Sequence, residues 1–412
     1  MEKRRCRFCH EELEDTFVDL GMSPLSNSYI PMEAADKGQM TYPLHAYVCK
    51  HCFLVQLEEY ETPEDIFRDY AYFSSYSASW LAHAERYTEA MMRDFGIDAS
   101  SQVVEVASND GYLLQYFKRA GVPVLGIEPA KNVAAVAEKE RGIPTISEFF
   151  GTKLAEELRA KGTQADLLIG NNVLAHVPDI NDFVEGLQML LAEDGFLTME
   201  FPHLMQLMEK TQFDTIYHEH FSYLSLRTVQ QIFAAHGLRI FHVEELPTHG
   251  GSLRIFACHD ASGRFPTRET VKALLQEERR AGLDRIETYR AFQQKVQKVK
   301  FDLLSCLIDL KRQGKTIVGY GAAAKGNTLL NYCGIRREFL DYVADRSPHK
   351  QGTLLPGSRI PVVAPDKIME TKPDCILILP WNLEGEIKEQ LKDVRSWGAK
   401  FIVPIPDVHI VE

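Results

Sequence analysis

The sequence predicts an α/β fold with a central Rossmann-like sheet, preceded by an N-terminal metal-binding lobe and followed by a C-terminal Rossmann-like α/β domain. Three observations lead to this prediction. Two Cys-x-x-Cys pairs, CRFC and CKHC, stand near the N-terminus. From residue 103, buried strands alternate with helical stretches, beginning with VVEVASNDGYLLQYF and VPVLGIEPAKNVAAVAEKE, as in a parallel, doubly wound sheet. A further strand, glycine-rich turn and helix, KTIVGYGAAAKGNTLLNY, begins at residue 315.

The composition is that of a globular protein. The chain has 412 residues, of which 45% are hydrophobic, so it can bury the cores of two or three domains. The formal net charge of -12 is spread along the chain, which argues against nucleic acid or an anionic membrane as the main partner. The start, MEKRRC, leads into no apolar segment, and no apolar run is long enough to span a bilayer. We therefore expect a cytoplasmic protein.

The paired cysteines predict a zinc site. Four thiols arrive as two knuckles, and together they complete a tetrahedral site with no open position for water. A zinc ion there would be structural and would hold together a small β-rich lobe that ends near Thr62. A redox pair or unligated turns are the alternatives. The predicted metal ligands are Cys6, Cys9, Cys49 and Cys52.

A helix is expected from about Trp80 to Phe95, where apolar residues recur every three or four positions. Tyr70, Tyr72 and Tyr76 lie among serines just before it. These rings either pack against the start of the helix or form a lid over a neighbouring pocket.

The turn ASNDG, at the end of the first central strand, predicts a nucleoside-binding site. Gly111 lets the backbone pass close to a ligand, and Glu128 ends the next strand, where a carboxylate can accept from both ribose hydroxyls. The dinucleotide pattern GxGxxG is absent, because the small residues are Ala107, Ser108 and Gly111. Glu105 would repel a phosphate but suits a cationic tail, such as the amino acid end of S-adenosylmethionine. Exposed carboxylates at strand ends, without a ligand, are the alternative.

Asn171 and Asn172 end the fourth strand, and His176 follows them into the same crevice. Further along, YHEHFSY places two imidazoles, one carboxylate and two phenols within residues 217–223. Such a set can move a proton near neutral pH and donate to a developing oxyanion. An aromatic strand edge or a surface turn is the alternative.

The remainder of the chain predicts the end of the central sheet, a helical bridge over residues 267–313 and the C-terminal domain. The turn GYGAAAKG, followed by Asp345, could bind a nicotinamide dinucleotide. Lys325, His349 and Lys350 instead favour the diphosphate of a sugar nucleotide. A tight turn without any ligand is the third alternative.

Together, the motifs CRFC, CKHC, YFSSYS, EVASNDGYLL, GNNVLAHVPD, YHEHFSYLS, THGGSLR and GYGAAAKGNTLLN resemble those of zinc-containing C-methyltransferases that act on nucleotide-linked keto-deoxysugars. The resemblance covers nearly the whole chain. It implies an S-adenosylmethionine site on the central sheet and a sugar nucleotide between that sheet and the C-terminal domain. It also implies that His220 is the base, that Glu219, Tyr217 and His176 surround the sugar, and that a tyrosine of YFSSYS, Tyr72 or Tyr76, covers the cofactor.

We therefore expect a zinc lobe at residues 1–65, a methyltransferase domain at 66–262, and a helical bridge with a sugar-nucleotide-binding domain at 263–412. The expected reaction is methyl transfer from S-adenosylmethionine to carbon 3 of a nucleotide-linked 4-keto-6-deoxysugar, with dTDP as the expected nucleotide, through an enolate. An NAD-dependent oxidoreductase and a non-catalytic sugar-nucleotide-binding scaffold are the alternatives. A monomer or a small homo-oligomer is expected.

The expected catalytic residues are His220, Glu219, Tyr217, His176 and Tyr223. The expected cofactor-binding residues are Tyr72, Tyr76, Glu105, Ala107, Asn109, Gly111, Glu128 and Asn171. The expected substrate-binding residues are Asn172, Lys325 and Asn327.

Overall fold

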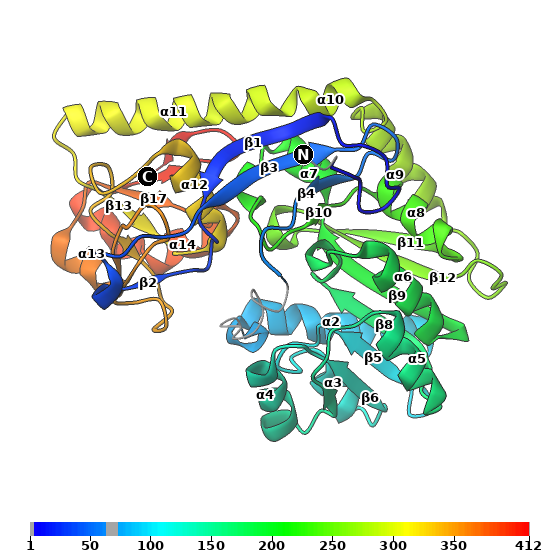
Figure 1. Cartoon of the computed structure of the whole chain (residues 1–412). Coiled ribbons are helices and arrows are strands. Elements are labelled where there is room, and N and C mark those ends of the chain that lie inside the picture. Colours follow the sequence, from blue (N-terminus) through cyan, green and yellow to red (C-terminus); the bar gives the residue numbers. More distant parts are fainter. Residues whose placement is uncertain (1–3, 63–72, 412) are drawn as a thin grey trace. The chain divides into compact units, whose positions relative to one another are not determined.

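The computed structural model of the chain describes residues 4–62 and 73–411 (Figure 1). Within them the backbone forms two compact units, each built from several stretches of sequence. The first unit comprises Met1–Leu13, Cys49–Leu204 and Phe221–Asp284. The second comprises Glu14–Val48, Met205–His220 and Arg285–Glu412. The segment between the two cysteine knuckles therefore packs with the C-terminal residues, although it precedes the first unit's sheet in sequence.

The first unit contains a seven-stranded sheet in the order β11-β12-β9-β8-β5-β6-β7. Its strands are β5 Val103–Val106, β6 Val124–Ile127, β7 Thr145–Ile146, β8 Ala165–Asn171, β9 Leu191–Pro202, β11 Leu238–Leu246 and β12 Ser252–His259. Five of them are parallel, as predicted, but β12 is antiparallel to both β9 and β11. The sequence did not predict the direction of the last two strands. The connection from β11 to β12 is too short for a crossover and can join only antiparallel strands.

Helices cover this sheet. Helix α2, Ala78–Phe95, begins where the Ser77 hydroxyl accepts the N–H of Trp80 and ends at Gly96, whose φ of 71° suits glycine. This confirms the helix expected from Trp80 to Phe95. The other helices of the unit are α3 Leu114–Arg119, α4 Lys131–Arg141, α5 Thr152–Ala160, α6 Ile180–Leu190, α8 Leu226–Ala235 and α9 Glu269–Arg280. A short antiparallel pair, β4 Val55–Leu57 with β10 Ser222–Tyr223, lies in the same unit.

The order of the strands locates the crevice of the first unit. Strand β5 has β6 on one side and β8 on the other, so the chain reverses its direction of winding at β5. Ligands of doubly wound sheets bind outside the carboxyl ends of the strands at such a point. The residues that follow β5, β6 and β8 are therefore the ones expected to meet a ligand.

The second unit contains a six-stranded sheet in the order β16-β14-β13-β17-β18-β19, which reverses its winding at β13 in the same way. Its strands are β13 Ile317–Tyr320, β14 Val343–Ala344, β16 Val362–Val363, β17 Cys375–Ile378, β18 Lys400–Val403 and β19 His409–Val411. Only β19 is antiparallel to its neighbour. The helices are α10 Ile286–Arg290, α11 Phe292–Arg312, α12 Ala324–Cys333, α13 Asp366–Thr371 and α14 Glu384–Gln390, with α7 Leu204–Glu209 at the chain crossing between the units.

The segment between the knuckles joins this second unit through its aromatic residues. Strand β1, Asp15–Ser23, pairs antiparallel with β3, Tyr42–Val48, and lies along helices α10 and α11 (Figure 1). Phe17 stacks on Phe292, with ring centroids 4.5 Å apart, and meets the edge of Tyr289. A second short pair, β2 Ile30–Pro31 with β15 Thr353–Leu354, also connects the segment to C-terminal residues.

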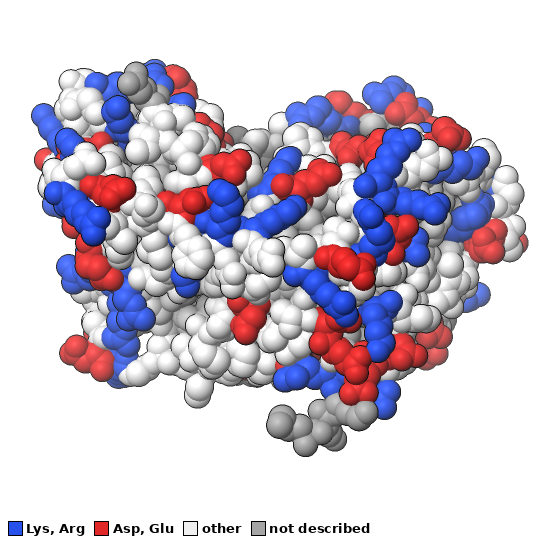
Figure 2. All heavy atoms as spheres, turned by 90° about the horizontal axis from the view of Figure 1, so that it is seen from above, with Lys and Arg blue, Asp and Glu red and all other residues white. Residues whose placement is uncertain are grey.

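Charged side chains of both signs are interspersed over the face shown in Figure 2, and neither sign forms a continuous field there. Among the helices that the structure describes, none has both the length and the apolar character needed to cross a membrane.

Candidate active site

The four knuckle cysteines come together in the first unit. Their ligand atoms all lie within 4.8 Å of one another. The Sγ atoms of Cys6 and Cys52 are 3.6 Å apart, those of Cys9 and Cys49 3.5 Å, and those of Cys9 and Cys52 3.7 Å. Zn–S bonds of about 2.3 Å in a tetrahedron place sulfur atoms about 3.8 Å apart. The cluster therefore fits zinc, as predicted from the spacing.

In the turn after β5, three alternate residues have a left-handed backbone conformation. Ala107, Asn109 and Gly111 have φ values of 57°, 49° and 75°. Only the last is a glycine, although this conformation costs least for glycine. A Cβ at Gly111 would come within 3.0 Å of Ile143, so the close approach inferred from the sequence is present. The backbone of this turn is therefore tightly curved, as in a nucleotide-binding loop. The turn lacks, however, the glycine pattern by which such loops are recognised in a sequence.

Glu128, directly after β6, holds this turn. Its Oε2 accepts the backbone N–H of Asn109 at 3.0 Å, and its Oε1 accepts that of Ala130 at 2.9 Å. Burial raises the pKa of Glu128 to about 7, although these two backbone donors oppose the shift. Each carboxylate oxygen keeps a second lone pair, so the side chain can still accept hydroxyl groups from a ribose.

Glu105 lies within β5 and is completely buried, not exposed at a strand tip. Burial, together with the nearby charges of Asp110 and Glu128, raises its pKa well above the ordinary value, while the Tyr112 hydroxyl opposes the shift. Arg141 lies 3.5 Å from Asp110 as a partial counter-charge. A group of buried carboxylates of this kind favours a cationic ligand. The sulfonium and ammonium groups of S-adenosylmethionine fit this chemistry.

The serine and tyrosine segment is anchored to the same turn. The N–H of Ser74 donates to Asn109 Oδ1 at 2.9 Å, and the Ser75 hydroxyl donates to Asp110. Tyr76, at the end of the short helix η2 Ser74–Tyr76, is 74% exposed, and its ring lies tilted beside that of Phe73 with centroids 5.4 Å apart. Tyr72, the other candidate lid residue, lies outside the described residues.

Two asparagines follow β8 at the same edge of the sheet. Asn171 Nδ2 lies 3.4 Å from the Tyr112 hydroxyl, and Asn172, with a φ of 54°, places its Nδ2 3.4 Å from His249 Nε2. His176 ends the short helix η3, Leu174–His176, which packs beside β10 and so brings Tyr223 into the same region. The first unit thus contains the described residues of the expected cofactor site, together with His176 and Tyr223 of the expected catalytic set.

The other catalytic candidates belong to the second unit, where the chain turns before β10. His220 Nδ1 lies 3.0 Å from the carbonyl oxygen of Thr215. Because a carbonyl can only accept, Nδ1 carries the proton and the lone pair of the neutral ring lies on Nε2. The ring of Tyr217 lies against that of His220, with centroids 4.1 Å apart. Glu219 accepts a hydrogen bond from Asn27 Nδ2 at 2.7 Å.

These observations can be compared with known proteins. A family model described as "C-methyltransferase C-terminal domain" matches residues 247–406, one described as "Methyltransferase domain" matches 80–243, and one described as "Putative zinc binding domain" matches 6–67. The C-methyltransferase NovU of Streptomyces niveus is 36% identical over 407 residues, which cover 98% of this chain and 96% of that protein. The chain belongs to the C-methyltransferase family.

Other likenesses to this C-methyltransferase are partial. The ubiquinone biosynthesis O-methyltransferase of Bartonella quintana is 26% identical over 96 residues, or 23% of this chain and 39% of that protein. Among solved structures, the PH0226 protein of Pyrococcus horikoshii matches 47% of this chain and 98% of its own, with a TM-score of 0.39 and 14% identity. The magnesium protoporphyrin IX methyltransferase of Synechocystis with bound SAM matches 43% of this chain and 79% of its own, with a TM-score of 0.34 and 15% identity.

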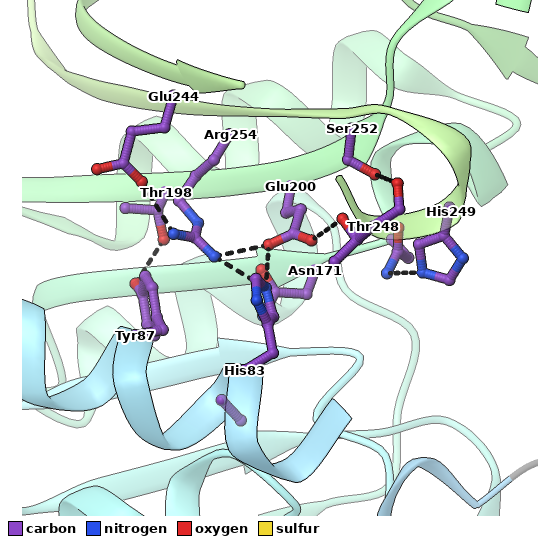
Figure 3. A network of polar contacts seen from close by, with 12 residues as sticks. His83, Tyr87, Asn171, Thr198, Glu200, Glu244, Thr248, His249, Ser252 and Arg254 are labelled. Carbon is purple, nitrogen blue, oxygen red and sulfur yellow. Dashed lines mark hydrogen bonds and ion pairs between the residues drawn. The ribbon is translucent and has the colours of Figure 1, made fainter. Parts of the chain in front are cut away.

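The C-methyltransferase also holds a buried polar network that local sequence patterns do not single out (Figure 3). Glu200, near the end of β9, is fully buried and accepts from Arg254 at 2.7 Å, from His83 at 2.9 Å and from Thr248 at 2.9 Å. Burial opposes its ionisation, but His83 and Arg254 prevail and lower the pKa of Glu200 to about 2. The network connects α2, β9, β12 and the turn that carries His249.

His249 itself is held in a left-handed conformation, with a φ of 56°. Its ring packs edge-on with that of Trp80, with centroids 5.4 Å apart, and its Nε2 lies 3.4 Å from Asn172 Nδ2. The motif THGGSLR contains this residue, but nothing in its spacing predicts a role beyond a turn. The structure places it at the same edge of the sheet as Asn171 and Asn172.

In the second unit of the enzyme, the glycine-rich turn after β13 is held by its own side chains. Asp345 Oδ2 accepts the N–H of Ala322 at 2.6 Å, while Lys350 and Tyr29 both donate to the carbonyl of Ala322, at 2.7 and 2.5 Å. Tyr29 comes from the segment between the knuckles, which the sequence did not connect to this turn. Its position is evident only from the packing.

The two substrate-binding candidates of α12 also have partners within this unit. Lys325 donates to Asn382 at 2.8 Å and lies 4.8 Å from the centre of the Trp381 ring. Asn327 donates to the carbonyl of Ser26 at 2.7 Å. Burial raises the pKa of Asp214 to about 6, although Lys325 and the Trp381 N–H at 2.7 Å oppose the shift. The first turn of α12 therefore supports the stretch that leads to His220.

Proposed function

We propose that this C-methyltransferase transfers a methyl group from S-adenosylmethionine to carbon 3 of a nucleotide-linked 4-keto-6-deoxysugar, with dTDP as the expected nucleotide. The observation that carries the proposal is the hydrogen bond from His220 Nδ1 to the Thr215 carbonyl. It assigns the proton to Nδ1 and the lone pair of the neutral ring to Nε2, on a buried histidine that lies against Tyr217 and follows Glu219 directly in the chain. Such a neutral imidazole suits the removal of a proton from carbon beside a carbonyl.

A base is needed because carbon 3 has no lone pair with which to accept a methyl group. His220 takes the carbon 3 proton onto Nε2, and the electrons of the C–H bond move into an enolate whose charge rests largely on the oxygen at carbon 4. Carbon 3 of the enolate then forms the new C–C bond. S-adenosylmethionine supplies the methyl group, and its sulfur keeps the electron pair of the bond that breaks.

His220 suits the role of base better than Glu219 does. A neutral imidazole with its lone pair on Nε2 is ready to accept a proton at neutral pH, where the ordinary imidazole pKa of about 6.5 is well matched to the task. Burial raises the pKa of Glu219, but the Asn27 amide donates to the same carboxylate and opposes this shift. The Asn27 contact therefore holds one carboxylate oxygen of Glu219 in a fixed position.

Phenols and imidazoles are the candidate donors to the enolate oxygen. Tyr217 lies against the ring of His220 in the second unit. Tyr223 and His176 lie in the same region of the first unit. Loss of one such donor commonly lowers turnover by about a hundredfold or more.

The cofactor assignment is supported by the crevice of the first unit. Glu128 presents a carboxylate for the two ribose hydroxyls, and the buried Glu105 favours the cationic end of the molecule. An NAD-dependent oxidoreductase remains the second candidate, because Asp345 holds the turn of the second unit as Glu128 holds that of the first. The Ala322 carbonyl in that turn, however, is taken by Tyr29 and Lys350, and this argues for a turn held by protein groups.

A product assay tests the proposal. The enzyme is incubated with S-adenosylmethionine and a panel of nucleotide-linked sugars, in which each 4-keto sugar is paired with its 4-hydroxy counterpart. We expect a mass gain of one methylene for a keto sugar only, with the new methyl carbon bonded to carbon 3 by NMR. Methylation of the 4-hydroxy sugar, or at an oxygen, would contradict the enolate route. Hydride exchange with NAD in place of methylation would favour the oxidoreductase.

A further inference from the structure

Arg7 stands inside the first cysteine knuckle, between the metal ligands Cys6 and Cys9, yet its side chain reaches away from the cluster. Its Nη2 donates to the carbonyl of Leu57 at 2.5 Å, and its Nη1 donates to the carbonyl of Pro178 at 2.5 Å. All of these residues belong to the first unit. One guanidinium therefore connects the knuckle to strand β4 and to the loop that follows β8 and η3.

Two of the residues beside the guanidinium, Pro178 and Phe221, lie close to catalytic candidates in the chain. Pro178 follows His176 by two residues. The guanidinium carbon also lies 5.4 Å from the centre of the Phe221 ring, and Phe221 directly follows His220. The N–H of Leu57 donates to the Phe221 carbonyl at 3.0 Å. Leu57, in β4, therefore contacts both Arg7 and the residue that follows His220.

On the knuckle side, Arg7 is fixed by contacts that depend on the cysteine geometry. Its N–H donates to Gln56 Oε1 at 2.9 Å, while Gln56 Nε2 donates to the Cys6 sulfur at 3.2 Å. Asn181 Nδ2 donates to the carbonyl oxygens of Arg7 and Phe8, at 3.2 and 3.0 Å. A metal ion that fixes the four sulfur atoms would thus also fix the point from which the guanidinium reaches out.

The chemistry of Arg7 suits a positioning role better than simple packing. A fork of rigid N–H donors can hold two carbonyl oxygens at once with defined geometry. A lysine carries all its donors on one nitrogen and so lacks this two-point geometry, and an apolar side chain has no donor at all.

We propose that Arg7 is a positioning residue for methyl transfer, which couples the zinc knuckle to the loop that carries His176 and to the chain that follows His220. This inference rests on the proposed roles of those two histidines. The metal site then acts on turnover through Arg7, in addition to stabilising the fold around the knuckle. Displacement of a catalytic group by about 1 Å commonly lowers turnover by about a hundredfold.

The test compares Arg7→Met, Arg7→Lys and the matched control Arg4→Met in the full-length enzyme. Arg4 precedes the same knuckle, but its side chain is 46% exposed and pairs with Glu58 at 2.7 Å. For each variant, the measurements are zinc per chain, affinity for S-adenosylhomocysteine, kcat and KM for the acceptor, and hydrogen exchange over residues 173–181.

We expect Arg7→Met to keep one zinc and to bind S-adenosylhomocysteine within about twofold of the wild type, with kcat lowered about 10- to 100-fold and faster exchange over residues 173–181. Arg7→Lys should recover part of kcat, and Arg4→Met should match the wild type. An unchanged kcat and unchanged exchange in Arg7→Met would overturn the proposal. Loss of zinc in Arg7→Met in parallel with kcat would also overturn it, because Arg7 would then act only by retaining the metal.

A second measurement covers the case in which Arg7→Met fails to fold. Zinc is removed from the wild-type enzyme with a chelator and then restored, while hydrogen exchange is followed. Exchange over 173–181 should rise on removal and fall on return of the metal, and a knuckle that loosens without any change in that loop would contradict the coupling. These exchange readouts need no acceptor, so they remain informative if the proposed acceptor is wrong.

Discussion

The backbone N–H of Asn109 donates to Glu128 Oε2 over 3.0 Å, and this contact ties the turn after the first central strand to the end of the second. The second unit repeats the arrangement, since the N–H of Ala322 donates to Asp345 Oδ2 over 2.6 Å. In each unit the same carboxylate also accepts the N–H two residues after itself, from Ala130 or from Ser347. The two units thus share one device for shaping a turn at the carboxyl end of a sheet.

The first prediction concerns cofactor binding at Glu128. Replacement Glu128→Ala removes the acceptor for the ribose hydroxyls and releases the turn at Asn109. Charge-assisted hydrogen bonds contribute about 1.5 to 3 kcal/mol each, so calorimetry should show S-adenosylhomocysteine binding weakened by at least tenfold. Unchanged affinity, or tight binding of NAD to the wild type, would contradict the cofactor assignment.

The second prediction is a pH dependence of that binding. The pKa of Glu128 is raised to about 7 in the ligand-free protein, and ribose hydroxyls donate to the ionised form. Affinity for S-adenosylhomocysteine should therefore rise between pH 6 and pH 8, with proton release near pH 7, measured by calorimetry in two buffers of different ionisation enthalpy. Glu128→Gln should release fewer protons. Equal release in both proteins would assign the effect to another group.

The same shift has a consequence for the stability of the ligand-free fold. Because the folded state holds the Glu128 proton more tightly than the unfolded chain does, this group contributes less stability as pH rises from about 4.5 to about 7. Denaturation of the wild type relative to Glu128→Gln should show this slope, and a slope of opposite sign would contradict the raised pKa.

The third prediction is that one zinc ion is bound per chain. Metal analysis of purified protein should give a ratio near one, and Cys49→Ser should lose the metal. Hydrogen exchange should then become faster over the knuckles and around Gln56, which donates to the Cys6 sulfur. Cys258→Ser, at a buried cysteine outside the cluster, serves as the control. A ratio far below one in freshly purified protein would reject the zinc assignment.

The fourth prediction concerns the buried network around Glu200. Replacement Glu200→Gln leaves the charge of Arg254 without its fully buried partner and should destabilise folding by about 3 to 5 kcal/mol in urea denaturation. Glu244 also pairs with Arg254, at 2.9 Å, but its side chain is 39% exposed. Glu244→Gln is therefore expected to cost about 1 kcal/mol or less. Equal losses for the two variants would show that burial does not set the contribution of Glu200.

Local patterns in the sequence were sufficient for the elements of both sheets and for the metal cluster. The alternation of strands, turns and helices from Val103 follows from which residues are buried. The spacing of the cysteines follows from the geometry of the metal site. The alternation could not reveal that β12 runs antiparallel, because a buried strand looks the same in either direction. The short connection through Gly250 and Gly251 was the available signal.

Contacts between residues far apart in the chain were not predictable in this way. Asn27 meets Glu219, and Tyr29 meets Ala322, across 192 and 293 positions of sequence. Hydrophobic periodicity carries no information about such pairs. From the sequence alone, the segment between the knuckles is expected to belong to the zinc lobe. The role of Glu200 was not predictable for a related reason. The function of a lone carboxylate in a buried strand is evident only when its partners are known.

The measurement that tests the central claim most directly is exchange of the carbon 3 hydrogen of the nucleotide-linked 4-keto sugar in heavy water. S-adenosylhomocysteine replaces the methyl donor, so proton removal is observed without methyl transfer, and Tyr223→Phe serves as a variant of a group proposed only as a donor. We expect the wild type to exchange this hydrogen and His220→Ala to lose the exchange while both ligands remain bound. Normal exchange in His220→Ala together with its loss in Glu219→Gln would contradict the account and make Glu219 the base.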